Sequence, residues 1–195
     1  MLMEEVHQLL DPGYLPIETG YYRLPNGQMH IAALTRMPGC KGKMVDWWFG
    51  YMDNNEKYRM WHPKDHLTLE WDEHRRPGDY IGASHLATQY HGDEIRKGKA
   101  LFRKPSDFFD TSKFEKAKVG AVICATATDP EKNVQIAQII HFVRDTEFGC
   151  EMRSRFWHFH GNEQLAAAVM RHCIEEMGYL ADFLPQLYTK EKVTK

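Results

Sequence analysis

Apolar and polar positions between residues 20 and 160 alternate in short runs, the pattern of β-strands that bury one face. Turn-forming residues separate the runs, and Pro25-Asn26-Gly27 lies between the two strands of a hairpin over 20–38. The predicted strands cover residues 21–24, 29–34, 66–71, 80–91, 99–103, 119–126, 134–144 and 150–160. Residues 41–60 space Trp47, Trp48 and Tyr51 as one or two short amphipathic helices would. Short turns between successive strands predict an antiparallel meander.

Beyond residue 161 the apolar spacing changes to the period of a helix. Asn162 is suited to cap the start of this helix, and Pro185 is expected to stop it. The predicted helix therefore runs from Glu163 to Leu184, and the last ten residues, which are polar, are expected to be frayed.

A large antiparallel sheet and one long helix pack economically when the sheet curves around the helix and leaves a cavity between them. We therefore predict an α+β fold of the helix-grip type, in which a curved antiparallel sheet wraps around the long C-terminal helix. The prediction is one domain, 1–195, made of an N-terminal appendage (1–19), the short helices and the sheet (20–160), and the C-terminal helix (162–184).

The composition suits a soluble protein, because 43% of the 195 residues are hydrophobic and 27% are charged. A net charge of −2 argues against nucleic acid and anionic membranes as partners. The sequence has no run of about 18 apolar residues and no secretory signal, so we expect a cytoplasmic location. Its 11 histidines, five tryptophans and nine tyrosines favour a pocket lined by such side chains, and the histidines suggest a metal site as a hypothesis.

A histidine and a glutamate interrupt the apolar stripe of the predicted C-terminal helix. The stripe runs through Leu165, Val169 and Leu180, and His172 and Glu176 lie in its middle, one turn apart. A carboxylate on a core-facing stripe must be compensated. One interpretation is a buried pair satisfied by hydrogen bonds. The other is that the pair supplies two ligands to a metal ion, because imidazole nitrogen and carboxylate oxygen both bind zinc. A catalytic zinc needs about three protein ligands.

The segment 58–66 offers a third ligand. Either His62 or His66 is a candidate. Pro63 favours an extended backbone at His62, and His66 begins a predicted strand. Asp65 either supports a ligand or caps a turn. A histidine with a purely structural role is the alternative for this segment.

Two other strands carry candidate residues. His85 and Gln89 share one face of the strand 80–91 with small residues, which leaves room for a ligand if that face is buried. His141 has apolar neighbours on a predicted buried strand. It is either a satisfied core histidine or a general acid/base, because its ordinary pKa is near neutrality.

Several motifs occur together in a fixed order from about residue 12 to residue 188. They are Gly20-Tyr21, Asp46-Trp47-Trp48-Phe49, Tyr58-x-x-Trp61-His62-Pro63-x-Asp65-His66, Tyr80-Ile81-Gly82-Ala83-Ser84-His85, Arg144-Asp145-Thr146, the run 151–157, and His172-x-x-x-Glu176 leading to Phe183-Leu184-Pro185-x-Leu187-Tyr188. In this combination the chain resembles the diacetylphloroglucinol hydrolase and phloretin hydrolase family.

The resemblance implies a Bet v 1-like helix-grip fold, usually dimeric. It also implies zinc-dependent hydrolysis of the carbon–carbon bond between an acyl group and a phenolic ring, although another divalent transition metal would suit the same ligands. By resemblance, His66, His172 and Glu176 match three metal ligands. The family's remaining ligand is a glutamate whose best match is Gln89, a weaker and neutral ligand, with His85 or Glu94 as alternatives.

The resemblance also assigns residues that handle the substrate, which is expected to be a small aromatic ketone. Tyr58 and His141 match polar pocket residues. Phe156 stands where the family has a tyrosine and Leu69 where it has an asparagine, so both substrate-binding positions lose hydrogen-bonding groups. The expected reaction is attack by water with retro-Claisen cleavage, which releases a carboxylic acid and the phenol.

Two other functions compete with this one. The first is a non-catalytic helix-grip protein that binds an aromatic small molecule, and the second is an ester or lactone hydrolase that uses the same metal. The intact pair of His172 and Glu176 favours an enzyme, because a hydrophobic carrier has no reason to bury it.

Overall fold

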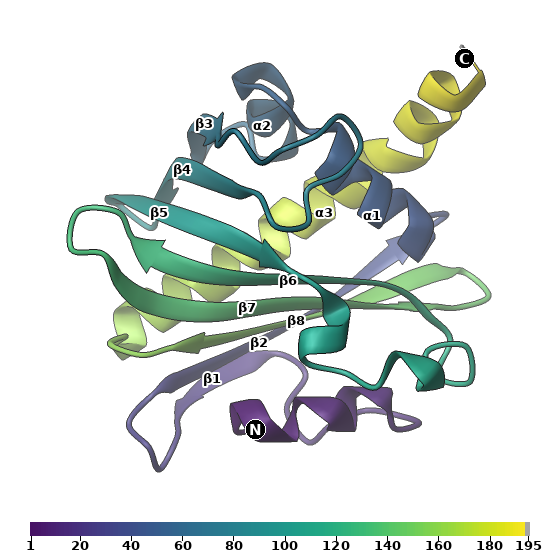
Figure 1. The fold of residues 1–195 in the computed structure, drawn as a ribbon. Helices are drawn as coiled ribbons and strands as arrows, with labels where there is room; N and C mark the ends of the chain where they lie inside the picture. Colours follow the sequence, from purple (N-terminus) through teal and green to yellow (C-terminus); the bar gives the residue numbers. More distant parts are fainter. Residues whose placement is uncertain (194–195) are drawn as a thin grey trace.

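A computed structural model describes residues 1–193. Its centre is one antiparallel sheet of eight strands in the order β1-β2-β8-β7-β6-β5-β4-β3 (Figure 1). The strands are β1 (Gly20–Arg23), β2 (Met29–Pro38), β3 (His66–Trp71), β4 (Ser84–His91), β5 (Glu94–Arg103), β6 (Val119–Asp129), β7 (Val134–Asp145) and β8 (Gly149–His158). The predicted meander is confirmed for β3 to β8, and the β1–β2 hairpin joins it through the pairing of β2 with β8.

The predicted strand 80–91 is too long at its start. Residues 80–83 form a turn in which Gly82 has a positive φ of 83° and the Tyr80 hydroxyl donates to Asp46 Oδ1 at 2.6 Å. Pairing begins at Ser84, opposite Leu101 of β5. Strand β5 in turn begins at Glu94, five residues before its predicted start, because a tight turn after His91 continues the hairpin.

The long helix α3 (Glu163–Val193) lies across one face of the sheet (Figure 1), as a helix-grip fold requires. The prediction that Pro185 stops the helix is wrong. A proline removes the hydrogen bond to the carbonyl four residues earlier, and here the thiol of Cys40 donates to that carbonyl, Ala181 O, at 3.7 Å. Tyr188 then packs edge-on against Trp47, with ring centroids 5.1 Å apart. The expected fraying is therefore replaced by helix up to Val193, and residues 194–195 lie outside the described chain.

Two short helices, α1 (Gly42–Tyr51) and α2 (Asn55–Trp61), confirm the prediction for residues 41–60. Asn54 caps α2 by accepting from Lys57 N–H at 3.0 Å. Both helices add aromatic side chains to the core between α3 and the sheet. At Gly42 a Cβ would lie 2.2 Å from the backbone of Gly120, so only glycine allows α1 to approach β6 so closely.

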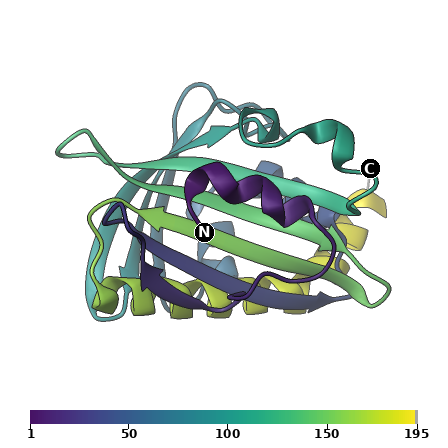
Figure 2. The same ribbon diagram turned by 90° about the horizontal axis from the view of Figure 1, so that it is seen from below.

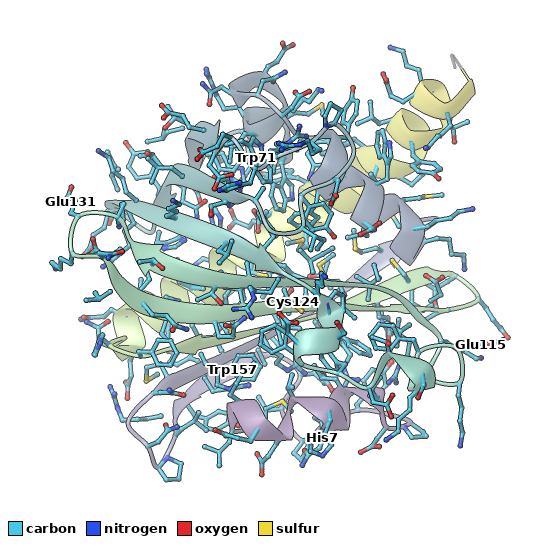
Figure 3. All side chains as sticks on the ribbon, viewed as in Figure 1. His7, Trp71, Glu115, Cys124, Glu131 and Trp157 are labelled. Carbon is cyan, nitrogen blue, oxygen red and sulfur yellow. The ribbon has the colours of Figure 1, made fainter. Side chains whose placement is uncertain are left out.

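The N-terminal segment covers the opposite face of the sheet. The 3-10 helix η1 (Met3–Leu10) lies across this face (Figure 2), and Figure 3 shows Trp157 on the same side. A second core forms there, made of Val6, Leu9, Leu24, Phe109, Val122, Cys124, Ile140, Phe142 and Trp157. Helix η1 thus packs against the sheet through Val6 and Leu9. Two more 3-10 turns, η2 (Pro105–Asp107) and η3 (Thr111–Lys113), connect β5 to β6.

Within residues 1–193, no helix combines the length and apolarity needed to cross a lipid bilayer.

Candidate metal centre and cavity

A cavity of about 750 Å³ lies between α3 and the sheet. Small residues on the sheet leave this space: Ala87, Gly98, Ala100, Ala125, Ala127 and Ala137 line it. Aromatic residues, including Phe49, Trp61 and Phe102, line it as well. The β6–β7 turn with Glu131, which Figure 3 shows at its tip, contributes to the lining at the edge of the sheet. The volume is within the range of about 300–1,000 Å³ for small-molecule sites.

Three predicted ligands come together beside this cavity, and two of them, His172 and Glu176, line it. His66 lies at the start of β3, and His172 and Glu176 lie one turn apart on α3. Glu176 Oε1 is 3.2 Å from His66 Nε2 and 4.0 Å from His172 Nε2. All three side chains are buried, and one ligand atom from each lies within 4.8 Å of the others. Burial raises the pKa of Glu176 to about 7.

Hydrogen bonds fix which imidazole nitrogens face Glu176. His66 Nδ1 donates to the Tyr58 carbonyl at 2.8 Å, and His172 Nδ1 donates to Asp65 Oδ2 at 2.9 Å. Both Nε2 atoms therefore carry lone pairs, and within residues 1–193 neither has a hydrogen-bond partner. Two imidazole nitrogens and a carboxylate that converge in this way, each histidine held by a second contact, fit a divalent metal such as zinc.

The same reasoning separates His66 from His62, which the sequence left as alternatives. The Asp65 backbone N–H donates to His62 Nδ1 at 3.1 Å, so Nδ1 is the acceptor and Nε2 carries the proton. That proton faces carboxylates, since Nε2 is 3.4 Å from Asp65 Oδ2 and 3.6 Å from Glu175 Oε2. The His62 ring also stacks on His172 with centroids 4.8 Å apart. His62, Asp65 and His172 form a second close group of possible metal-binding residues.

The candidates for the fourth ligand lie in different surroundings. Gln89 lines the cavity, and its amide contacts Tyr58 and His91. His85 lines the cavity and packs against the rings of Trp71 and Phe102. Glu94 is exposed and forms an ion pair with Arg96 at the surface. Among residues 1–193, neither close group of histidine and acidic side chains contains His85 or Glu94.

His141 lines the cavity, and burial lowers its pKa to about 4, which keeps the ring neutral at pH 7. Its Nδ1 is 2.8 Å from Ser154 Oγ. Phe156 lines the cavity and packs edge-on against His141 at 5.7 Å. Leu69 is buried in the core but does not line the cavity, so its position contributes to packing rather than to the described wall.

Tyr58 is almost fully buried, and its ring stacks on His66 with centroids 3.8 Å apart. Its hydroxyl donates to Gln89 Oε1, and burial raises its pKa well above the ordinary value.

Sequence reasoning missed Ser154 and His91. Ser154 is part of β8, a strand without visible alternation, and it reaches His141 only because β7 and β8 pair these two residues. His91 offered a signal, because it follows Gln89 at the spacing that shares a strand face.

The architecture is that of the Bet v 1-like proteins. The crystal structure of Ara h 8.0201 matches with a TM-score of 0.53 and 10% identity, over 81% of this chain and 98% of that one. The solution structure of KanY protein matches with a TM-score of 0.53 and 9% identity, over 85% of this chain and 99% of that one. These likenesses establish the fold.

The sequence comparison establishes the family. The family model described as DAPG hydrolase PhiG domain matches residues 1–162, and the chain belongs to this family. A 2,4-diacetylphloroglucinol hydrolase of Pseudomonas sp is 25% identical over 222 aligned positions, which cover 95% of this chain and 76% of that protein. The phloretin hydrolase of Eubacterium ramulus is 25% identical over 207 positions, which cover 90% and 73%. These relatives are hydrolases.

Proposed function

We propose that this protein is a metal-dependent hydrolase that cleaves the carbon–carbon bond between an acyl group and a phenolic ring in an acylphloroglucinol-like substrate. The observation that carries the proposal is the buried convergence of His66 Nε2, His172 Nε2 and the Glu176 carboxylate beside the cavity, which His172 and Glu176 line. The names of the relatives support the reaction and the substrate class. The alanine-lined cavity beside the three residues is large enough for an acylated ring.

The donor set fits Zn²⁺, or another divalent transition metal, held by His66, His172 and Glu176. When bound, such a metal supplies a Lewis acid and a water of lowered pKa. Asp65 holds the His172 ring through Nδ1, and the Tyr58 carbonyl holds the His66 ring in the same way.

His141 is the residue that we assign to proton transfer. With Nδ1 donating to Ser154 Oγ, its Nε2 carries the lone pair, and the low pKa keeps this lone pair free at pH 7. The oxygen atom of the attacking water forms the new bond to the acyl carbon. The proton released by that water is accepted at His141 Nε2 and then passed to the ring carbon as the carbon–carbon bond breaks. The products are a carboxylic acid and a ring with a new C–H bond.

The test is product analysis with monoacetylphloroglucinol in H₂¹⁸O. The expected products are phloroglucinol and acetic acid that carries one ¹⁸O atom, formed by metal-loaded wild type and not by His141→Ala. A ligand that binds and is recovered unchanged would instead favour the non-catalytic binding protein. Cleavage of phenyl acetate without cleavage of the ketone would favour the ester hydrolase.

A homodimer and a cytoplasmic location remain predictions of the sequence. Sedimentation of the purified protein tests the first, and imaging of a tagged chain in cells tests the second.

A further inference from the structure

Both ends of the Gln89 side-chain amide are engaged in hydrogen bonds within the protein. The Tyr58 hydroxyl donates to Gln89 Oε1. Gln89 Nε2 donates to His91 Nε2 at 2.7 Å. An amide has one carbonyl oxygen to offer a metal, and in Gln89 this oxygen accepts the phenolic proton.

The backbone explains why Gln89 and His91 act together. Both lie on the same face of β4, two residues apart, and Gln89 pairs with His66 across the β3–β4 ladder. The His91 ring packs edge-on against His172 with centroids 5.1 Å apart. The chain of contacts from Tyr58 through Gln89 to His91 therefore runs beside the metal-binding residues, which it touches through the rings of His66 and His172.

We propose that Gln89 is a positioning residue for Tyr58, supported by His91, and that it is not a ligand of the metal in this chain. The inference rests on the proposed function, because it concerns the same cavity. It assigns three protein ligands to the metal rather than four. It also assigns a defined role to the Tyr58 oxygen: since its proton is donated to Gln89, its lone pairs face the cavity as an acceptor for a hydroxyl group of the phenolic substrate.

The first experiment asks whether Gln89 binds metal, and it needs no turnover. Co²⁺ is added to metal-free wild type, Gln89→Leu, Glu176→Ala and Gln138→Leu, and its visible spectrum and dissociation constant are measured. Gln138 is a matched control, because it is a buried glutamine with hydrogen bonds to Thr126 Oγ1 and Ala125 O, and it does not line the cavity. We expect Gln89→Leu and Gln138→Leu to match wild type within about twofold, and Glu176→Ala to lose the site.

A changed cobalt spectrum or clearly weaker binding in Gln89→Leu alone would overturn the proposal, because both report a lost ligand. A Gln89→Glu variant sharpens the comparison. A carboxylate at this position would compete for the metal, so we expect tighter Co²⁺ binding than in wild type.

The second experiment asks whether Gln89 acts through Tyr58. A double-mutant cycle compares wild type with Tyr58→Phe, Gln89→Leu and the double variant. For each protein, the dissociation constant of phloroglucinol and kcat/KM for monoacetylphloroglucinol are measured. Each single change is expected to cost about tenfold, the effect of one lost hydrogen bond. The double variant should be no worse than Tyr58→Phe, since Gln89 has nothing left to position.

Multiplied losses in the double variant would overturn the positioning role. If wild type does not cleave the ketone, the proposed function fails, whereas the cobalt spectra and the phloroglucinol cycle still decide the role of Gln89.

Discussion

The carboxylate of Asp65 accepts a 2.9 Å hydrogen bond from the imidazole of His172, which lies 107 residues later in the chain. The bond fixes the ring so that Nε2 faces Glu176. Contacts of this kind to metal-binding histidines typically change affinity 10–100-fold. We therefore expect Asp65→Ala to weaken zinc binding by about that factor, measured by competition with a chelator. Glu70→Ala, an exposed change on β3, the strand that begins directly after Asp65, is the control. Equal affinities would show that Asp65 does not orient the ligand.

Metal binding should also stabilise the folded protein. A ligand that binds the native state at 100 times its dissociation constant adds about 2.7 kcal/mol to the free energy of unfolding. We expect zinc to raise the melting temperature of wild type and of Glu175→Gln, whose half-exposed side chain directly precedes Glu176 on α3. Glu176→Gln should show no such rise. A zinc-dependent rise of equal size in Glu176→Gln would remove Glu176 from the ligand set.

Ser154 should control the activity of His141. Its Oγ is 2.8 Å from His141 Nδ1. In the proposed mechanism it accepts from Nδ1, which leaves the lone pair on Nε2. Without this acceptor the ring is free to adopt the other tautomer or to rotate, so we expect Ser154→Ala to lower kcat about tenfold with little change in KM. Ser154→Thr keeps the hydroxyl and should retain most of the activity. Equal losses in both variants would indicate damaged packing instead.

His30 predicts a loss of stability in acid. It is 1% exposed among apolar neighbours and the rings of Tyr22 and Trp157, and burial lowers its pKa to about 3 from an ordinary 6.5. The unfolded chain therefore binds a proton that the folded chain does not, and stability falls as pH drops from 6.5 towards 3.

Between pH 7 and pH 5 this one group accounts for about 2 kcal/mol of the free energy of unfolding. In urea titrations of metal-free protein, His30→Leu should lose correspondingly less stability over this interval than wild type. An identical pH dependence would mean that His30 is protonated in the folded state.

Glu18 should be required for the packing of the N-terminal segment. Its carboxylate accepts hydrogen bonds from two buried arginines, Arg153 at 2.6 Å and Arg155 at 2.5 Å. Removing one partner of a buried ion pair leaves uncompensated charge and costs about 3–5 kcal/mol. We expect a loss of this order in urea unfolding of Glu18→Ala, and little change in the exposed control Glu4→Ala. A loss below about 1 kcal/mol would mean that water replaces the carboxylate.

Much of the fold was predictable because it depends on periodicity. The strands with one buried face and the apolar stripe of α3 are visible in the sequence, and His172 and Glu176 stand out because they interrupt that stripe. The end of α3 was not predictable. Whether a helix continues through Pro185 depends on a partner for the Ala181 carbonyl, and Cys40, which supplies it, is 141 residues away.

The site was predictable as a set of residue types but not as a set of roles. The choice between His62 and His66 rests on which ring nitrogen accepts a backbone N–H, and that depends on the turn between α2 and β3. The expectation for Gln89 came from a family position, whereas its hydrogen bonds depend on Tyr58 and His91 of this chain. Periodicity carries no information about such contacts between side chains.

Strand β8 is covered on both faces, by α3 and the core on one side and by the N-terminal segment on the other, so every residue from Gly149 to Trp157 is buried. It also pairs along its length with β2 and β7. No partial opening at either sheet edge, β1 or β3, exposes its backbone. Its amide protons should therefore exchange with deuterium only when the whole molecule unfolds, which makes β8 the internal reference for the global stability of this protein.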